Sequence, residues 1–206
     1  MAQFYEIHPD NPQPRLIKHA VDIIHQGGVI IYPTDSCYAL GCHLGDKTAI
    51  ERICRIRQLD HKHHFTLMCR DLSEIATYAS VTDPAYRWLK RLTPGPFTFI
   101  LKATREVPRR LQNPKRKTIG IRVPQHPITS SLLNALNEPL MSATLHLPGE
   151  EWPMSDPYEM RQRFEHTVDL IIEGGSCGLE PTTIVDLETD VPQIIRQGKG
   201  DASALR

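Results

Sequence analysis

No long hydrophobic run occurs in the sequence, and we therefore expect no membrane-spanning segment and no membrane partner. The longest apolar stretches are short, for example residues 28–32, whereas a helix that crosses a bilayer needs roughly 20 apolar residues. Residues 1–7 also lack a basic start followed by an apolar stretch, so we expect no secretory signal. With 40% apolar and 23% charged residues, the composition is typical of a globular protein, which we expect to be cytoplasmic.

Cysteine is scarce and irregularly spaced, which argues against a disulfide framework and against a structural zinc site. The number of cysteines is odd, and no two of them form a CxxC pair. Free, mostly buried thiols in a reducing compartment are the favoured interpretation. The five residues are Cys37, Cys42, Cys54, Cys69 and Cys177.

A short histidine cluster is the other feature that suggests a metal. His61, His63 and His64 lie beside Lys62. Their spacing does not put two imidazoles on one helical face with a third ligand in view, so we expect no metal site. A surface loop that becomes basic below neutral pH is the favoured interpretation.

The common fingerprints of nucleotide binding and hydrolysis are missing as well. The sequence contains neither GxxxxGKS/T nor GxGxxG, whose glycines let the backbone cradle phosphate groups. It also lacks a GxSxG nucleophile elbow and a Cys–His pair with a local signature. Residue patterns alone therefore indicate a globular α/β domain with a candidate anion site.

Charge is balanced in sum but uneven along the chain. The 24 basic and 24 acidic side chains cancel. Residues 102–122 nevertheless carry eight basic side chains and one acid, whereas residues 150–190 carry eleven acids and two arginines. Such segregation favours a basic face that attracts a polyanion. The alternative is that folding interleaves the two segments and cancels the field.

Hydrophobic periodicity predicts alternating helices and strands in a single α/β domain spanning residues 1–206, with an open mixed sheet. Helical spacing and capping residues predict helices over 14–26 and 126–136, one that follows Asp46, and one that opens at Thr82. Apolar runs bounded by turn residues predict the strands. These are residues 29–32, 66–69, 97–102, 118–123, 140–144, 168–172, 183–187 and 193–196.

Polar, turn-forming residues sit at the ends of several predicted strands, where ligands bind in open α/β sheets. Residues 32–41 offer the hydroxyls of Thr34 and Ser36 and the carboxylate of Asp35, although a capped turn has the same composition. Arg55 and Arg57 end a predicted helix, where cations are favourable for the helix dipole alone. A paired guanidinium clamp for phosphate is the functional alternative.

Three further segments share this character. Residues 93–98 form a stiff turn into a strand, for which a structural role is the favoured interpretation; ligand approach to the backbone at its glycine is the alternative. Arg122 alternates with apolar residues in its strand, and a charge there needs an internal carboxylate or a bound anion as partner. Hydroxyls cluster at 142–144 and 182–184, where the β-propensity of threonine is an equally good explanation.

Together these segments resemble the YrdC/YciO family of threonylcarbamoyl-AMP synthases, and its YciO branch in particular. The family motif PTDTVYGLG is matched by PTDSCYALG at residues 33–41, and WPGPLT by TPGPFT at 93–98. VRxPxHP is matched by IRVPQHP at 121–127, STIV by TTIV at 182–185, and LRPG by IRQG at 195–198. The matches are collinear over about residues 7–200.

The resemblance implies a twisted open sheet enclosing a basic concave cleft, and it implies a reaction. Threonine, bicarbonate and ATP, with Mg²⁺ as an accompanying ion, would give threonylcarbamoyl-AMP and pyrophosphate on the way to a modified tRNA adenosine. No tightly bound cofactor is implied. Double-stranded RNA or tRNA is the implied macromolecular partner.

The resemblance also implies roles for individual residues. The residues that would hold the amino acid are Thr34, Arg122, Ser142 and Thr182. The residues that would surround ATP are Arg55, Arg57, Thr118, Thr144 and Arg196, with Arg55 and Arg57 as the catalytic pair.

Three positions depart from the family pattern. Arg55 stands where the family's KxR motif has lysine, Gln58 where a proline is usual, and Thr144 where its SxN motif has asparagine. Losing one preorganised polar contact in an active site costs about 10²–10³ in rate, so the resemblance implies weak or altered synthase activity. The alternatives are a non-enzymatic RNA-binding protein in tRNA or rRNA maturation or ribosome assembly, and the same adenylate chemistry on another substrate.

Overall fold

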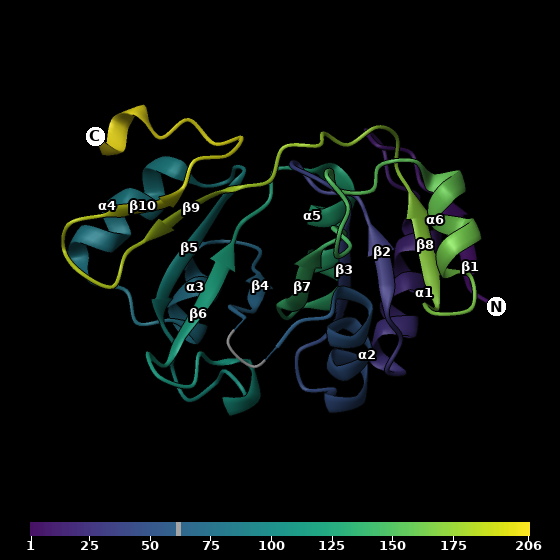
Figure 1. Ribbon diagram of the computed structural model, residues 1–206, viewed down its shortest axis with the longest axis horizontal. Helices are drawn as coiled ribbons and strands as arrows, with labels where there is room; N and C mark the ends of the chain where they lie inside the picture. The colour runs from purple at the N-terminus through teal and green to yellow at the C-terminus, as the bar shows by residue number, and fades with distance from the viewer. Residues whose placement is uncertain (61–62) are drawn as a thin grey trace.

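The computed structural model describes residues 1–60 and 63–206 (Figure 1). Its strands form one sheet in the order β1-β8-β2-β3-β7-β4-β6-β5-β9-β10. The strands are β1 (Gln3–Glu6), β2 (Ile30–Tyr32), β3 (Ala39–His43), β4 (Thr66–Met68), β5 (Phe97–Lys102), β6 (Thr118–Arg122), β7 (Leu140–Thr144), β8 (Leu170–Glu173), β9 (Thr183–Asp186) and β10 (Gln193–Arg196).

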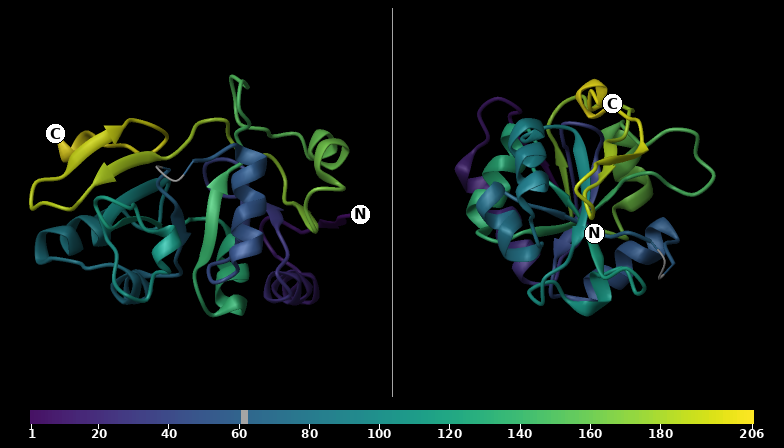
Figure 2. Two further views of the ribbon diagram at one scale, coloured as in Figure 1. Left: turned by 60° about the horizontal axis from the view of Figure 1, so that its bottom comes forward. Right: turned by 90° about the vertical axis from the view of Figure 1, so that its left-hand side faces the viewer.

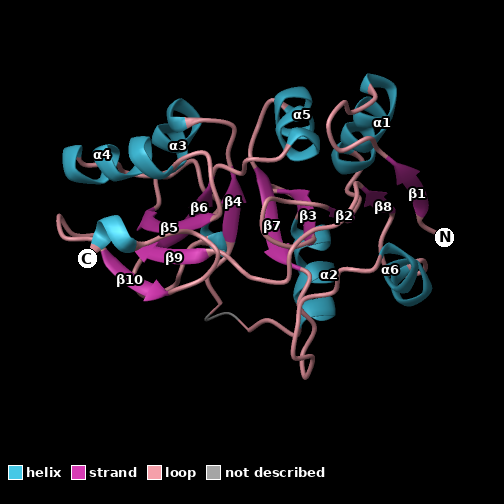
Figure 3. Ribbon diagram, turned by 90° about the horizontal axis from the view of Figure 1, so that it is seen from above, coloured by secondary structure: helices cyan, strands magenta, loops and turns pink. Residues whose placement is uncertain are grey.

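Helices cover both faces of this sheet. Figure 3 shows α1, α3, α4 and α5 on one side of the strands and α2 and α6 on the other. The helices are α1 (Pro14–His25), α2 (Lys47–Arg57), α3 (Leu72–Tyr78), α4 (Asp83–Leu92), α5 (Pro127–Leu136) and α6 (Pro157–Phe164), with short 3-10 turns η1 (Arg109–Leu111) and η2 (Ser203–Leu205). The termini lie at opposite ends of the molecule (Figure 2). The α/β fold with an open mixed sheet is thus confirmed.

The sheet is mixed, because it contains both parallel and antiparallel pairs of strands. Strands β1 and β2 both run parallel to β8, as β4 does to β6 and β5 to β9. The remaining neighbours are antiparallel. The central register sets Gly41 opposite Ser142 and Thr66 opposite both Gly120 and Ser142. Small and hydroxyl side chains are therefore neighbours at the middle of the sheet.

Two apolar clusters hold the layers together. The larger one contains residues of α2, α3, α4 and α6, and it includes Ile53, Leu89 and Phe164. The smaller one contains residues of α1 and α5, and it includes Ile24 and Leu132. Burying one such side chain contributes about 1.5–3 kcal/mol.

Local capping explains where several helices begin. The carboxylate of Asp46 accepts a hydrogen bond from the Ala49 N–H at 2.9 Å, which satisfies a donor that the first turn of α2 leaves open. Thr82 caps α4 in the same way, through Ala85 at 3.3 Å. Both starts agree with the sequence predictions.

The elements missed from sequence are β1, β3, α3 and α6. β3 lies within the polar segment 32–41, where turn residues concealed a strand. α3 has only seven residues, and β1 has four and pairs with β8, far away in sequence. Short elements carry too few periods for a pattern to show. None of the described helices has both the length and the apolar character that a membrane span requires.

The folded chain brings part of the basic segment against part of the acidic one. The Arg116 guanidinium pairs with the carboxylates of Asp186 and Glu188, and the Lys102 ammonium lies 3.8 Å from Glu188. Folding therefore interleaves the two segments here, as the second interpretation of the charge pattern predicted. Arg109, Arg110, Lys115 and Lys117 remain exposed.

Candidate functional site

A cavity of about 270 Å³ opens over the part of the sheet where Thr66, Gly120 and Ser142 are paired in the register. Successive strand residues point to opposite faces, so the register sets which side chains form the floor. Thr66, Thr98, Gly120, Ser142 and Ile184 line it. A Cβ atom at Gly120 would come within 2.8 Å of the Thr66 hydroxyl, so the floor has no room for a side chain at that position.

Arg57, the last residue of α2, reaches the cavity past the end of β7. Its Nη1 donates to the main-chain oxygen of Thr144 at 2.6 Å. Its Nε is buried and has no hydrogen-bond partner among the described residues. Burial lowers the pKa of this guanidinium. A desolvated cation with a free donor is a suitable contact for an anion.

Arg196 on β10 approaches the cavity from the opposite side. Its Nε and Nη2 donate to the Thr182 main-chain oxygen at 3.1 and 2.8 Å, and Nη2 lies 3.3 Å from the Thr182 hydroxyl. The Thr182 hydroxyl in turn shares a hydrogen bond of 2.7 Å with Thr98. Partial burial lowers the pKa of Arg196. Two arginines thus face a pocket of hydroxyl groups.

The turn after β2 is held by Thr34. Its buried Oγ1 accepts from the N–H groups of Ser36 and Cys37 at 3.1 and 3.2 Å, and it donates to the Cys37 oxygen at 2.6 Å. This is the capped turn that the sequence left open as an alternative. The same bonds fix the backbone that carries Asp35.

Arg122, on β6, finds an internal carboxylate. Its Nη2 donates to Asp35 at 2.6 Å, and the other oxygen of Asp35 accepts from the Gln125 N–H at 2.9 Å. The side chains of Arg122 and Asp35 are only 6% and 9% exposed. Arg122 Nε is buried and has no partner among the described residues. Asp35 therefore neutralises the charge of Arg122, but the Nε donor of Arg122 has no described partner.

Tyr32 is a site residue that the sequence analysis did not single out. Its hydroxyl shares a 2.6 Å hydrogen bond with the Ser142 hydroxyl, and both groups are buried. Burial raises the pKa of Tyr32, so it stays a neutral phenol. The signal available in sequence was its place at the end of a buried strand, directly before the PTD motif.

The histidines differ from their predicted behaviour. His63, His64 and His146 line the cavity. Desolvation, with smaller contributions from Arg57 and His64, lowers the pKa of His63 to about 4, so it does not become basic just below neutral pH. The expectation of a basic loop is therefore wrong for His63, and His61 lies outside the described residues. The described part of the chain contains no cluster of three or more His, Cys, Asp or Glu side chains that could hold a metal ion.

The structure gathers most, though not all, of the residues singled out in the sequence. Thr118, Gly120 and Arg122 alternate along one face of β6, and Thr118 Oγ1 is a further buried polar atom without a described partner. Thr34 lies on the neighbouring turn beside Asp35. The predicted residues in direct contact with the cavity are Arg57, Ser142, Thr144, Thr182 and Arg196.

Thr34, Thr118 and Arg122 are not among the lining residues, and Arg55 lies apart. It lines a separate surface depression with Arg52 and His166. Residues two apart on a helix point to roughly opposite sides, because each residue turns the chain by about 100°. A paired clamp of Arg55 and Arg57 is therefore not what this geometry provides.

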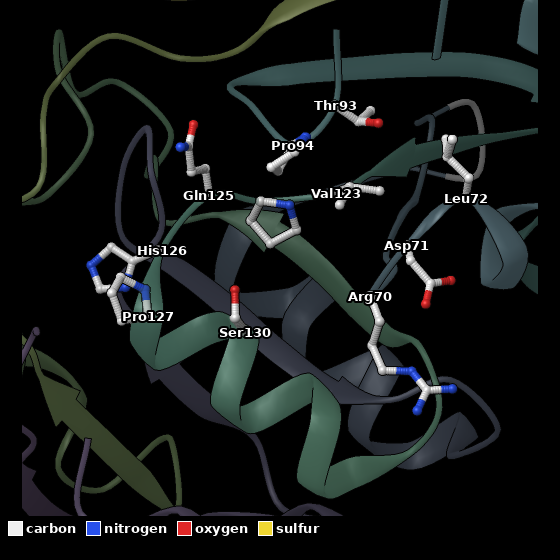
Figure 4. Close-up of a pocket in the computed structure, with 11 residues that line it drawn as sticks. Arg70, Asp71, Leu72, Thr93, Pro94, Val123, Gln125, His126, Pro127 and Ser130 are labelled. Carbon is white, nitrogen blue, oxygen red and sulfur yellow. The ribbon is translucent and has the colours of Figure 1, made fainter. Parts of the chain in front are cut away.

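A second, larger depression of about 610 Å³ lies near the start of α5, between α3 and the turn before β5 (Figure 4). Its cation, Arg70, is already bonded to Glu74 and Asn137. It is lined by parts of the 93–98 turn and the 121–127 motif, but by none of the residues predicted to bind ATP or the amino acid. The smaller cavity has the open donor of Arg57 and two lining arginines, Arg57 and Arg196, so it is the better candidate site.

The thiols do not supply an activated nucleophile. All five cysteines are free, as predicted. Cys177, beside the Thr34 turn, donates its thiol hydrogen to the Thr34 oxygen at 3.4 Å, and burial raises its pKa to about 11. Burial also raises the pKa of Cys37. A nucleophilic cysteine needs the opposite shift.

Comparison with known proteins adds relatives along the whole chain. A family model for Sua5, YciO and YrdC, described as "Telomere recombination", matches residues 22–198. The uncharacterized protein YciO of Escherichia coli (strain K12) is 61% identical over 201 residues, 98% of each chain. An uncharacterized protein of Haemophilus influenzae is 58% identical over 204 residues, covering 98% of this chain and 99% of that one.

Solved structures agree with these matches. The crystal structure of E. coli YciO superposes with a TM-score of 0.97 at 59% identity and covers 100% of both chains. The crystal structure of P. abyssi Sua5 complexed with L-threonine superposes with a TM-score of 0.87 at 24% identity, over 96% of this chain and 58% of that one. At this identity the second match shows a shared fold.

Proposed function

The chain belongs to the Sua5/YciO/YrdC family, and from that premise we propose that its cavity binds ATP and threonine and forms threonylcarbamoyl-AMP. One observation carries the proposal. Among the described residues, Arg57, Thr118 and Arg122 each have a buried polar atom without a protein partner. Arg57 lines the cavity, and the other two flank Gly120, which lines it, on β6. Buried polar groups are nearly always bonded, so three open ones in one region support a polar ligand as the missing partner.

The nucleotide half of the proposal rests on Arg57, Thr118, Thr144 and Arg196. Guanidinium groups offer forked donors that match phosphate oxygens. The described lining residues include no carboxylate. A Mg²⁺ ion would therefore be held by the phosphate oxygens of ATP rather than by this chain, and its chemistry would be to neutralise phosphate charge.

The amino-acid half rests on Thr34, Arg122, Ser142 and Thr182. A structure of Sua5 complexed with L-threonine supports threonine as the ligand to test, since that protein shares this fold. The open Nε of Arg122 is the donor that a ligand carboxylate would accept from. The hydroxyls of Ser142 and Thr182 would take the polar groups of the amino acid.

The proposed chemistry is a transfer to the α-phosphate. The amine of threonine and bicarbonate form a carbamate with loss of water. A carbamate oxygen then bonds to the α-phosphorus while the bond to the bridging oxygen of the β-phosphate breaks and pyrophosphate leaves. Charge develops on the phosphate oxygens, where Arg57 and Arg196 would stabilise it electrostatically.

Pyrophosphate release from ATP and Mg²⁺, measured with threonine and bicarbonate and with each component omitted, tests this proposal. We expect release that requires both co-substrates. Arg57→Met should lower ATP affinity about 10- to 100-fold, the value of one or two charge-assisted hydrogen bonds. Arg55→Met removes the same charge from the other side of α2 and should cost less than threefold.

Two results would contradict the proposal. If the folded protein released no pyrophosphate, the proposed synthase activity would be wrong. A larger loss for Arg55→Met than for Arg57→Met would restore the paired clamp that the family motif implies and that this geometry does not provide.

A second candidate function, RNA binding, has one observation in its favour. Arg109, Arg110, Lys115 and Lys117 are exposed on η1 and the turn before β6, and no acidic partner is described for any of them. Binding of double-stranded RNA that weakens steeply with added salt would support this role, because each phosphate contact releases counterions. Reversing two of these charges to glutamate should then flatten the salt dependence.

A further inference from the structure

Lys199 is a cation at the site that neither the family motifs nor the cavity floor includes. It lies on the arm of residues 197–200 that follows β10. The arm is fixed in place, because its Lys199 N–H donates to the Pro181 oxygen at 2.8 Å and its Gly198 N–H to the Thr183 hydroxyl at 3.0 Å. A Cβ atom at Gly198 would lie 2.3 Å from the Pro181 oxygen, so this close approach requires glycine.

From this arm the Lys199 side chain crosses to the Thr34–Cys37 turn. Its ammonium donates to the main-chain oxygen of Asp35, whose side chain holds Arg122. Asp35 therefore has one cation on its backbone and another on its carboxylate. Two chain segments about 160 residues apart meet at this point.

The charges at this point do not cancel once Lys199 is counted. Arg122 and Asp35 form a buried pair that is neutral as a unit. An anion that accepts from the open Nε of Arg122 would therefore meet no net charge from that pair. Lys199 adds one positive charge, and its ammonium has three donors, of which the described bond to Asp35 uses one.

We propose that Lys199 binds the carboxylate of the amino-acid substrate together with Arg122, as a specificity-determining residue of the site. The inference rests on the proposed function and deepens it, since it names the group of the ligand that the C-terminal arm recognises. Lysine suits this position because its ammonium is a compact charge on a flexible stem that can turn from the Asp35 oxygen to a ligand. Its side chain is exposed and needs no rearrangement of the core.

A purely structural role is the competing explanation. The bond from Lys199 to Asp35 would then only tie the arm to the turn. The two roles differ in which ligands a substitution of Lys199 would affect. A structural tie acts on every ligand of the turn alike, whereas a carboxylate contact acts on ligands that carry a carboxylate.

Calorimetric titration with L-threonine and with L-threoninol, which has a hydroxymethyl group in place of the carboxylate, separates the two. We expect the wild-type protein to prefer threonine. Lys199→Gln should weaken threonine about 10- to 100-fold and leave threoninol within about twofold, and Lys199→Arg should recover part of the loss. Lys18→Gln, on the exposed face of α1, is the matched control and should change neither affinity.

Equal weakening of both ligands by Lys199→Gln, or no weakening of either, would overturn the inference while leaving the proposed function in place. Failure of the wild-type protein to bind threonine would overturn the proposed function, and this inference with it. Thermal unfolding of each variant, measured in parallel, confirms that the titrated protein is folded.

Discussion

One face of the sheet has two regions that differ in chemistry although they share strands. At the β8–β2–β3 end, α1 and α5 cover it with aliphatic side chains. Toward β6, β5 and β9 the same face becomes the cavity. The change occurs within single strands: Met68 and Leu140 belong to the smaller core, whereas Thr66 and Ser142, two residues away, line the cavity. The alternation of side chains along a strand sets which face of the sheet each residue is on. Here the positions that a helix covers are apolar, and those that line the cavity are polar.

The comparison also shows two ways of satisfying burial. The covered end is satisfied mainly by apolar packing, and a buried hydroxyl there, that of Thr129, already has a partner in the Pro33 oxygen at 2.7 Å. The cavity end buries charges and hydroxyls, and each needs a partner or pays a desolvation cost. The open donors of Arg57, Thr118 and Arg122 all belong to this second region. Stability and ligand binding are therefore expected to respond to mutation differently at the two ends.

The largest effect is expected where the cavity end buries a charge pair. Asp35→Ala leaves Arg122 buried without its carboxylate, which should lower the free energy of unfolding by about 3–5 kcal/mol. Urea denaturation measures it. The double variant Asp35→Ala/Arg122→Met should regain much of the loss, since no buried charge then lacks a partner. Equal instability of the single and double variants would show that the pair does not act as a unit.

At the covered end the matching test is Leu132→Ala in α5. Leu132 is fully buried in the smaller core, so the cavity left behind should cost about 2–4 kcal/mol of unfolding free energy. Because no polar partner is lost, ATP and threonine affinities of the folded protein should stay within about twofold. A large change in either affinity would show that the two regions are not separable.

A smaller effect is expected from His63 through pH. The pKa of His63 is about 4 in the folded protein, compared with an ordinary value of 6.5 in the unfolded chain. The unfolded state therefore binds the proton more readily. The contribution is fully present above about pH 6.5 and is lost as pH falls toward 4. Allowing for partial exposure, we expect about 1–2 kcal/mol. His63→Gln should reduce the pH dependence of the urea denaturation midpoint over this range. An unchanged pH dependence would contradict the lowered pKa of His63.

The smallest effect is expected for Thr118→Val. The variant removes a buried hydroxyl that has no described partner, so stability should stay the same or rise by up to about 1 kcal/mol. If this hydroxyl contacts the nucleotide, ATP affinity should fall several-fold in the same protein. Thermal unfolding and ATP titration measured together decide between a ligand contact and a bond that the folded chain already satisfies. A loss of stability would indicate the latter.

Local signals account for the parts of the fold that the sequence predicted. β5, β7 and β10 have the predicted bounds, and α1, α2, α4 and α5 begin within a residue or two of their capping signals. Apolar periodicity and caps act over a few residues, so they can be read without knowing the fold. Helix α6 also has a cap, Asp156, but its eight residues gave no clear apolar stripe, and it was missed.

The residues of the candidate site were likewise predicted only in part. The family motifs named Arg57, Arg122, Ser142, Thr182 and Arg196, all of which the structure places at or beside one cavity. They also named Arg55, which lies on the other side of α2. A motif records which residues occur together, but the turn of the helix decides which of them face one ligand.

The sequence by itself determined an α/β chain, its free thiols and the need of Arg122 for a partner, and it left the capped turn of Thr34 open as one of two interpretations. Only the tertiary structure decided that this partner is Asp35, that Tyr32 bonds Ser142, and that Lys199 reaches the same turn from the other end of the chain. These contacts depend on strand order and register across a ten-stranded sheet. Strand order and register are set by packing between distant segments, which no local pattern encodes.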